Sequence, residues 1–241
     1  VPGPRDLHGA LPAMCQHVHR LVRRTHGLLT AAAAMLVALL QTGVAMPSAA
    51  ADPCPDIEVI FARGTGAPPG LGWLGEAFVD SLRGKVGGRS VGAYGVNYPA
   101  GFDFDASAPL GAADAAGRVR WMVDNCPNTK LVLGGNSQGA GAIDLITVDP
   151  RPLGRYVPTP MPLDVAGHIA AVAVFGNPLR DMRGGGPLPQ LSGTYGSKTI
   201  DLCALDDPFC SKGLNFPAHM SYVANGMVEE ATNFVADRLR E

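Results

Sequence analysis

The stretch VLGGNSQGAGAIDL, residues 132–145, is the most informative part of this chain about its fold. Its centre, residues 135–139, matches the pattern G-x-S-x-G around Ser137. An apolar run at residues 129–136 precedes the serine, and residues 137–148 have the composition of a helix. A strand, a sharp turn packed with small residues and a helix are the context of a nucleophile elbow. We therefore predict that Ser137 is a nucleophile; the alternative is a serine that caps a helix.

Further apolar runs lie on both sides of this stretch. We expect strands at residues 57–63, 90–98, 129–136, 168–178 and 198–205, and helices at 111–126, 137–148 and 221–239. Apolar strands that alternate with helices are typical of a parallel sheet covered on both faces. The sequence therefore predicts an α/β fold, a three-layer α/β/α sandwich whose central parallel sheet has about five strands. Two segments rich in glycine and proline, residues 149–164 and 180–193, are expected to be surface loops.

The first residues have a different character from the remainder. Three arginines precede an uncharged apolar run at residues 27–40, and small residues follow, with Ala49 and Ala51 suitably spaced for cleavage. This order is typical of a secretory signal peptide, and the apolar run is short for a membrane anchor, which needs about 20 residues. We expect residues 1–51 to be an N-terminal extension with a signal peptide, and residues 52–241 to form one secreted catalytic domain without a transmembrane anchor.

The composition of residues 52–241 narrows the functional classes. These residues carry 15 basic and 20 acidic side chains, a net charge of −5 with histidine neutral. A nucleic-acid-binding protein would usually be basic, so we expect no nucleic-acid partner. Four cysteines, an even number, indicate two disulfides with three pairings open. Zinc is the alternative, but the chain has no C-x-x-C pair and few histidines, so we expect no metal.

A serine nucleophile needs a base and an acid to orient it. Of the two histidines after residue 51, His168 begins an apolar strand, whereas His219 lies in a loop beyond the last strand. That loop is where the order serine, acid, histidine requires the base, so we favour His219 over a solvent-exposed role. The acid should lie at the end of the last strand, where the segment DLCALDDPFCSK offers Asp201, Asp206 and Asp207, and the residue pattern does not separate Asp206 from Asp207.

Oxyanion stabilisation requires backbone N–H donors near the nucleophile. One is expected from Gln138, which follows the serine, and the other from a loop after an early strand. The segment ARGTGAPPG at residues 62–70 fits this second position, with Thr65 as the donor. The alternative is an ordinary glycine turn.

Four segments together resemble the cutinase family, and its bacterial members most closely. They are FARGTG at 61–66, GGNSQGA at 134–140, CALDDPFC at 203–210 and FPAHMSY at 216–222, and they follow the family order. The resemblance covers nearly all of residues 52–241. It implies a compact α/β-hydrolase fold without a large lid. It also implies hydrolysis of carboxylic esters, including cutin, short- and medium-chain esters and sometimes triglycerides or phospholipids.

The resemblance also implies a role for individual residues. It makes Ser137 the nucleophile, Asp207 the acid and His219 the base, with Thr65 and Gln138 as the oxyanion hole. The acid is the fifth residue of the family's C-x-x-x-D-x-x-C segment, which selects Asp207 over Asp206. The disulfides implied are Cys54–Cys126 and Cys203–Cys210. Leu214 and Phe216 are candidate acyl contacts, whose alternative role is loop packing.

Two features depart from the plant-pathogen cutinases. Those enzymes usually have serine where this chain has Thr65, and the insertion at residues 151–161 is longer here. Loops around the site set the acyl pocket, so the substrate need not be cutin.

These observations predict a monomeric secreted serine esterase that acts on an ester or lipid substrate and requires no cofactor. Lipase, phospholipase or acetylxylan esterase activity on the same fold is the neighbouring alternative. A non-catalytic secreted protein that binds the cell wall is an alternative of a different class. A protease is disfavoured because no specificity pocket or peptide-binding strand can be identified.

Overall fold

The computed structural model describes residues 54–241, so the expected signal peptide lies outside the described residues. Five strands form one sheet, in which every neighbouring pair is parallel. They are β1 (Ile57–Ala62), β2 (Val91–Gly95), β3 (Lys130–Asn136), β4 (Ile169–Phe175) and β5 (Thr199–Leu202), in the order β2-β1-β3-β4-β5. The five predicted strands are confirmed.

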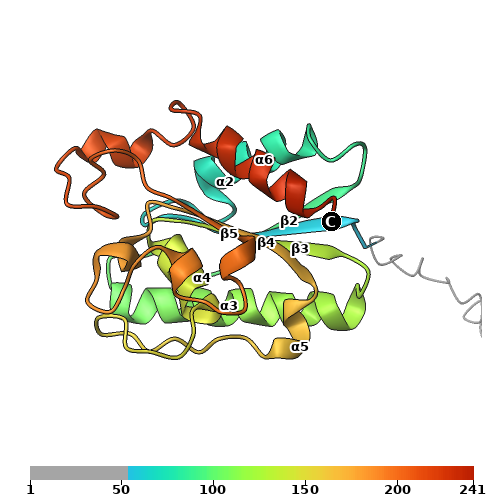
Figure 1. Ribbon diagram of the computed structural model, residues 1–241, viewed down its shortest axis with the longest axis horizontal. Helices are drawn as coiled ribbons and strands as arrows, with labels where there is room; N and C mark the ends of the chain where they lie inside the picture. Colours follow the sequence, from blue (N-terminus) through green and yellow to red (C-terminus); the bar gives the residue numbers. More distant parts are fainter. Residues whose placement is uncertain (1–53) are drawn as a thin grey trace, which may run out of the picture. The chain divides into compact units, whose positions relative to one another are not determined.

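Helices cover both faces of the sheet (Figure 1). On one face lie α2 (Gly72–Arg83) and α6 (Met227–Arg238), whose apolar residues pack with Val59, Phe61 and Phe175 of the sheet. On the other lie α3 (Phe104–Asn125), α4 (Gln138–Thr147) and the short α5 (Leu163–Ala166), packed on Ile60, Leu133 and Val174. Alternate residues of each strand thus feed two separate cores, and the predicted three-layer sandwich is confirmed.

One helix was not predicted, and two helices begin at other residues than expected. The helix α2 was not predicted, because its first residues are rich in glycine and resemble a loop. One of these, Gly75, is required, since a Cβ there would lie 2.7 Å from the Phe61 ring. The helix α3 begins at Phe104 rather than residue 111, because the Asp103 side chain accepts a hydrogen bond from the Ala106 amide and caps it. The helix α6 begins at Met227, because Gly226 has a left-handed φ of 83°.

The loops contain four short 3-10 helices: η1 (Pro178–Asp181), η2 (Leu188–Gln190), η3 (Gly196–Lys198) and η4 (Phe216–Met220). The predicted surface loop at 180–193 therefore contains η2, and the one at 149–164 runs into α5. Both disulfides implied by the resemblance are present. Cys54, just before β1, is bonded to Cys126 at the end of α3, and Cys203 after β5 is bonded to Cys210.

The strand order creates a switch point between β1 and β3. The chain passes from β1 outward to β2 and then returns to place β3 on the opposite side of β1. In open parallel sheets, ligands bind in the crevice beyond the carboxyl ends of the strands at such a point. Ala62 is paired in register with Gly135, so the loop after β1 and Ser137 after β3 emerge side by side.

Candidate active site

Ser137 joins β3 to α4 in a strained conformation. Its φ is 55° and its ψ is −120°, which is uncommon for a residue with a side chain. Two hydrogen bonds fix this turn: the Ser137 amide donates to the Phe175 carbonyl at 2.8 Å, and the Ser137 carbonyl accepts from the Gly141 amide at 3.2 Å. Strain of this kind persists only where surrounding structure imposes it, and it is characteristic of functional sites.

The two glycines of the G-x-S-x-G pattern are required because a side chain at either position would clash with the backbone. A Cβ at Gly139 would lie 2.0 Å from the Ala62 carbonyl oxygen, and one at Gly135 would lie 2.4 Å from the Gly139 carbonyl oxygen. Neither backbone position can move without displacing β1 or the first turn of α4. The pattern is therefore required by the close packing of β1, β3 and α4.

Gln138 is the first residue of α4, and its side chain is bound on both sides. Its amide nitrogen donates to the Gly101 carbonyl at 2.7 Å and to the Thr65 hydroxyl at 3.4 Å, and its carbonyl accepts from the Ser107 hydroxyl at 2.8 Å. The backbone N–H groups of the first helical turn have no partner within the helix. Gln138 thus links the loop of Thr65 to the N-terminus of α4, and both residues border the space beside Ser137.

Arg63 organises the loop that carries Thr65, and sequence reasoning missed it. Its side chain is buried, and its guanidinium donates to the carbonyls of Ala67, Val96, Tyr98 and Pro99 at 2.7–3.3 Å. The Tyr98 hydroxyl in turn donates to the Arg63 carbonyl. The motif FARGTG contains the arginine, but nothing in the sequence indicates that the carbonyls of three residues more than 30 positions later surround it together with the nearby Ala67 carbonyl.

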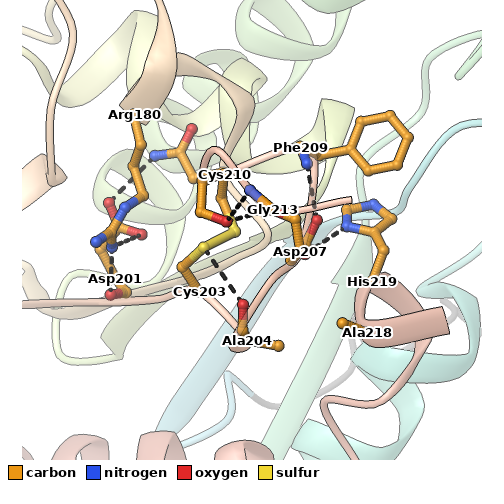
Figure 2. The surroundings of a disulfide bond; sticks show 12 residues. Arg180, Asp201, Cys203, Ala204, Asp207, Phe209, Cys210, Gly213, Ala218 and His219 are labelled. Carbon is orange, nitrogen blue, oxygen red and sulfur yellow. Dashed lines mark hydrogen bonds and ion pairs between the residues drawn. A yellow bond between two sulfur atoms is a disulfide. The ribbon is translucent and has the colours of Figure 1, made fainter. Parts of the chain in front are cut away.

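Asp207 and His219 are hydrogen-bonded to one another (Figure 2). The Asp207 Oδ2 lies 2.7 Å from His219 Nδ1, and Asp207 is fully buried. Its Oδ1 accepts from the Phe209 amide at 2.8 Å. Asp206, by contrast, is exposed and has a left-handed φ of 63°. The geometry therefore distinguishes the two candidates. Asp207 contacts the histidine, whereas Asp206 lies in the turn just before Asp207.

Tyr222 is a further member of this cluster that sequence reasoning missed. Its hydroxyl donates to Asp207 Oδ2 at 2.5 Å and accepts from the Ala204 amide at 3.1 Å. Burial, followed by the hydrogen bond to Asp207, raises the pKa of Tyr222 well above its ordinary value, so the phenol stays a donor. Tyr222 belongs to the segment FPAHMSY, but its partner lies 15 residues earlier and only folding brings the two together.

His219 is held by close contacts on several sides. A Cβ at Gly176 would lie 2.7 Å from His219 Cε1, so only glycine leaves room for the ring, and its φ of 56° also favours glycine. The Phe209 ring packs against the imidazole, tilted by 41° and with ring centroids 4.2 Å apart. His219 is 9% exposed. With Nδ1 bound to Asp207, the free ring nitrogen is Nε2.

Ser137 and His219 line the same cavity, of about 560 Å³, together with Thr65 and Gln138. We call it the catalytic pocket. Its wall is mainly apolar, and Trp73, Phe102, Phe104, Phe209 and Met220 line it while remaining at least 40% exposed. Among residues 54–241 no hydrogen bond joins the Ser137 hydroxyl to His219; such bonds often tighten only when substrate binds.

Leu214 and Phe216 are not among the residues that line the catalytic pocket. They are 87% and 64% exposed, respectively. Phe216 packs edge-on against Phe209, which does line it, with ring centroids 5.9 Å apart. The structure therefore does not bring these two predicted acyl contacts into the pocket.

Two other features were sought in the described part of the chain. Residues 54–241 contain no group of three or more histidine, cysteine, aspartate or glutamate side chains arranged to hold a metal ion. No helix in this same range is both long and apolar enough to cross a bilayer.

The sequence of this chain is similar to those of known proteins with the cutinase fold. The cutinase family model matches residues 53–239. Carboxylesterase Culp1 of Mycobacterium tuberculosis is 50% identical over 210 residues, covering 86% of this chain and 92% of that protein. Phospholipase Culp4 of the same organism is 49% identical over 217 residues, covering 90% and 92%.

Two solved structures are similar as well. A Trichoderma reesei cutinase in complex with a phosphonate inhibitor has a TM-score of 0.61 and 30% identity, with 78% of each chain covered. An acetylxylan esterase has a TM-score of 0.64 and 27% identity, with 77% of this chain and 99% of that one covered. The chain is a hydrolase and belongs to the cutinase family.

Proposed function

We propose that this chain is a secreted serine carboxylesterase that cleaves short- to medium-chain esters through Ser137, Asp207 and His219. The observation that carries the proposal is the buried Asp207–His219 hydrogen bond beside a pocket that also contains the strained Ser137. The names of the relatives, carboxylesterase and phospholipase, support the ester substrate. Residues 52–241 would form the catalytic domain, and residues 1–51 would be its leader.

The reaction begins with His219. Its Nε2 removes the proton from the Ser137 hydroxyl as the oxygen attacks the ester carbonyl, forming a tetrahedral intermediate. The backbone amides of Gln138 and Thr65 stabilise the oxyanion, assisted by the N-terminus of α4. His219 then donates the proton to the leaving alcohol. Water attacks the acyl-enzyme by the same route, which releases the acid and restores Ser137.

Asp207 keeps the imidazole in the productive orientation and stabilises its positive charge. Donors from Phe209 and Tyr222, in addition to His219, surround the carboxylate and fix its position. The Cys203–Cys210 disulfide encloses this loop and keeps the buried carboxylate in place. Two disulfides also agree with an oxidising compartment, as expected of a secreted protein.

The apolar wall of the catalytic pocket favours an ester whose acyl group is a hydrocarbon chain over one whose acyl group is charged or polar. Phospholipid hydrolysis is the second candidate. It is supported by the 49% identity to a protein named phospholipase and by the partly exposed aromatic side chains that line the pocket. Acetylxylan esterase activity has less support, because a cavity of about 560 Å³ is large for an acetyl group.

The test is a rate series on p-nitrophenyl butyrate, octanoate and palmitate, together with a diacyl phospholipid. Wild type should hydrolyse butyrate or octanoate best, and Ser137→Ala should lower kcat by at least about 10⁴-fold with the fold intact. Faster turnover of the phospholipid than of every simple ester would favour the second candidate. Full ester turnover by Ser137→Ala would overturn the mechanism.

A further inference from the structure

A second cavity, of about 640 Å³, lies between α3 and the loop that follows α4. Its wall is largely apolar and consists on one side of small residues of α3, namely Pro109, Ala112, Ala113 and Ala116. On the other side lie Ile146 at the end of α4 and Val157, which is 73% exposed. We call this cavity the α3 groove. The mechanism above does not use it.

The α3 groove adjoins the catalytic pocket. Four residues line both cavities: Asp105, Leu145, Arg155 and Tyr156. Along α4, the catalytic pocket is lined by Gln138, Gly141 and Leu145, and the groove by Leu145 and Ile146. At 1.5 Å per residue, Leu145 lies about 10 Å along the helix from Gln138. The groove therefore begins at the end of the pocket that is remote from Ser137.

Three of the shared residues form a contact across this boundary. Arg155 Nη1 donates to Asp105 Oδ2 at 2.7 Å, and the Tyr156 hydroxyl donates to Asp105 Oδ1 at 3.3 Å. We call these three side chains the Asp105 bridge. Asp105 belongs to the first turn of α3, whereas Arg155 and Tyr156 belong to a tight turn in which Leu153 and Tyr156 pair. The bridge thus joins the two walls where the cavities meet.

The Asp105 bridge is held weakly. The Arg155 and Asp105 side chains are 71% and 54% exposed, and an exposed ion pair of this kind adds little stability. The turn that carries Arg155 is held at its base, where Gly154 donates to the Arg183 carbonyl and Leu153 is buried. The side chains at its tip can therefore move while the base of the turn stays in place.

We propose that the α3 groove is a subsite for the distal part of a long acyl chain whose carbonyl lies at Ser137, and that the Asp105 bridge controls entry to it. This assignment rests on the proposed esterase function and extends it to long-chain esters. The position of the groove beyond Leu145, on the same line along α4, favours the far end of one chain over a second, separate ligand.

The first test fills the groove with Ala113→Phe, because Ala113 is exposed and lines the groove but not the catalytic pocket. We expect the ratio of kcat/KM for palmitate to that for butyrate to fall about tenfold, since each lost methylene contact weakens transition-state binding. The matched control is Asp124→Phe, an exposed position on α3 about 16 Å further along the helix. Asp124 lines neither cavity, so the ratio should stay at the wild-type value.

The second test opens the boundary with Tyr156→Ala, measured with the same esters in the same detergent dispersion. This change should raise the palmitate-to-butyrate ratio several-fold, and Ala113→Phe added to it should abolish the gain. If wild type hydrolyses butyrate but neither variant changes the ratio, the groove assignment is wrong and the esterase proposal stands. If wild type hydrolyses no ester, the proposed function fails and the groove assignment fails with it.

Discussion

Among the single residues, the buried carboxylate of Asp207 depends on two donors that the sequence does not reveal, the Phe209 amide and the Tyr222 hydroxyl, in addition to the predicted partner His219. Three hydrogen bonds reach it, from the Phe209 amide, the His219 ring and the Tyr222 hydroxyl, and the tyrosine contact is the shortest at 2.5 Å. A hydrogen bond to a charged group is worth about 1.5–3 kcal/mol, more than one between neutral groups. Tyr222 is therefore a positioning residue, which acts on the reaction through Asp207 and His219.

Tyr222→Phe removes the hydroxyl that fixes Asp207 and also leaves the Ala204 amide without its acceptor. We expect kcat for butyrate to fall about tenfold with little change in KM, because His219 loses orientation while the acyl pocket is intact. Steady-state kinetics measures the fall in kcat, and urea unfolding measures the stability lost with the two hydrogen bonds.

Tyr195→Phe is the matched control for this change. Tyr195 is buried, but among the described residues its hydroxyl has no hydrogen-bond partner, so kcat should be unchanged and stability should not fall. Equal losses of kcat in the two variants would mean that the effect comes from general packing and not from the contact with Asp207.

At the scale of elements, a buried polar cluster joins α4, η1 and β5 behind the catalytic pocket. Asn177 donates to Asp144 Oδ2 at 2.8 Å and to Asp201 at 3.4 Å, and Arg180 pairs with Asp201 at 3.1 Å. Asp144 is fully buried, and its Oδ1 has no partner within residues 54–241. Burial and then the nearby Asp201 raise the pKa of Asp144 well above its ordinary value of 3.8. Asp144 is therefore expected to stay protonated in the native state where an unfolded chain would ionise it.

This shift in the pKa of Asp144 predicts how stability depends on pH. Above about pH 3.8 the unfolded chain releases the proton that the native state keeps, so the free energy of unfolding should fall as pH rises toward the raised native pKa. Asp144→Asn keeps the shape and removes the titration. The variant should be more stable than wild type near pH 7, and the difference should shrink toward pH 4.

Urea unfolding at several pH values measures this difference, with Asp124→Asn, an exposed substitution on α3, as the control that should show none. A difference between Asp144→Asn and wild type that is constant with pH would contradict the protonated state of Asp144.

The elements also indicate what could be predicted from the sequence. Each strand is marked by its own apolar residues, so all five were found, and the G-x-S-x-G turn was identified from its neighbours on both sides. The helix α2 was missed because its early glycines, including Gly75, are required by contact with β1 and not by a loop. The roles of Arg63 and Tyr222 depend on partners that are distant along the chain, which no local pattern specifies.

At the scale of the whole molecule, the order β2-β1-β3-β4-β5 brings the separate pieces of the site together. The chain reverses direction across the sheet between β2 and β3, so the loop of Thr65 and the elbow of Ser137 lie adjacent at the carboxyl edge. The loops that follow β4 and β5 then supply Gly176 and Asp207, and the approach to α6 supplies His219 and Tyr222. Alternation of strands and helices predicted the layers, but the strand order, and with it this convergence, depends on long-range packing.

Ser137 is proposed as the nucleophile of an assembled triad, and covalent labelling is the direct test of this role. The folded, disulfide-intact protein is treated with a fluorophosphonate, and the modified residue is located by peptide mass spectrometry. We expect one adduct on Ser137, which forms in wild type and is strongly reduced in His219→Ala because the serine loses its base. Absence of an adduct on Ser137 in the folded protein, or an adduct that forms equally fast without His219, would contradict this role.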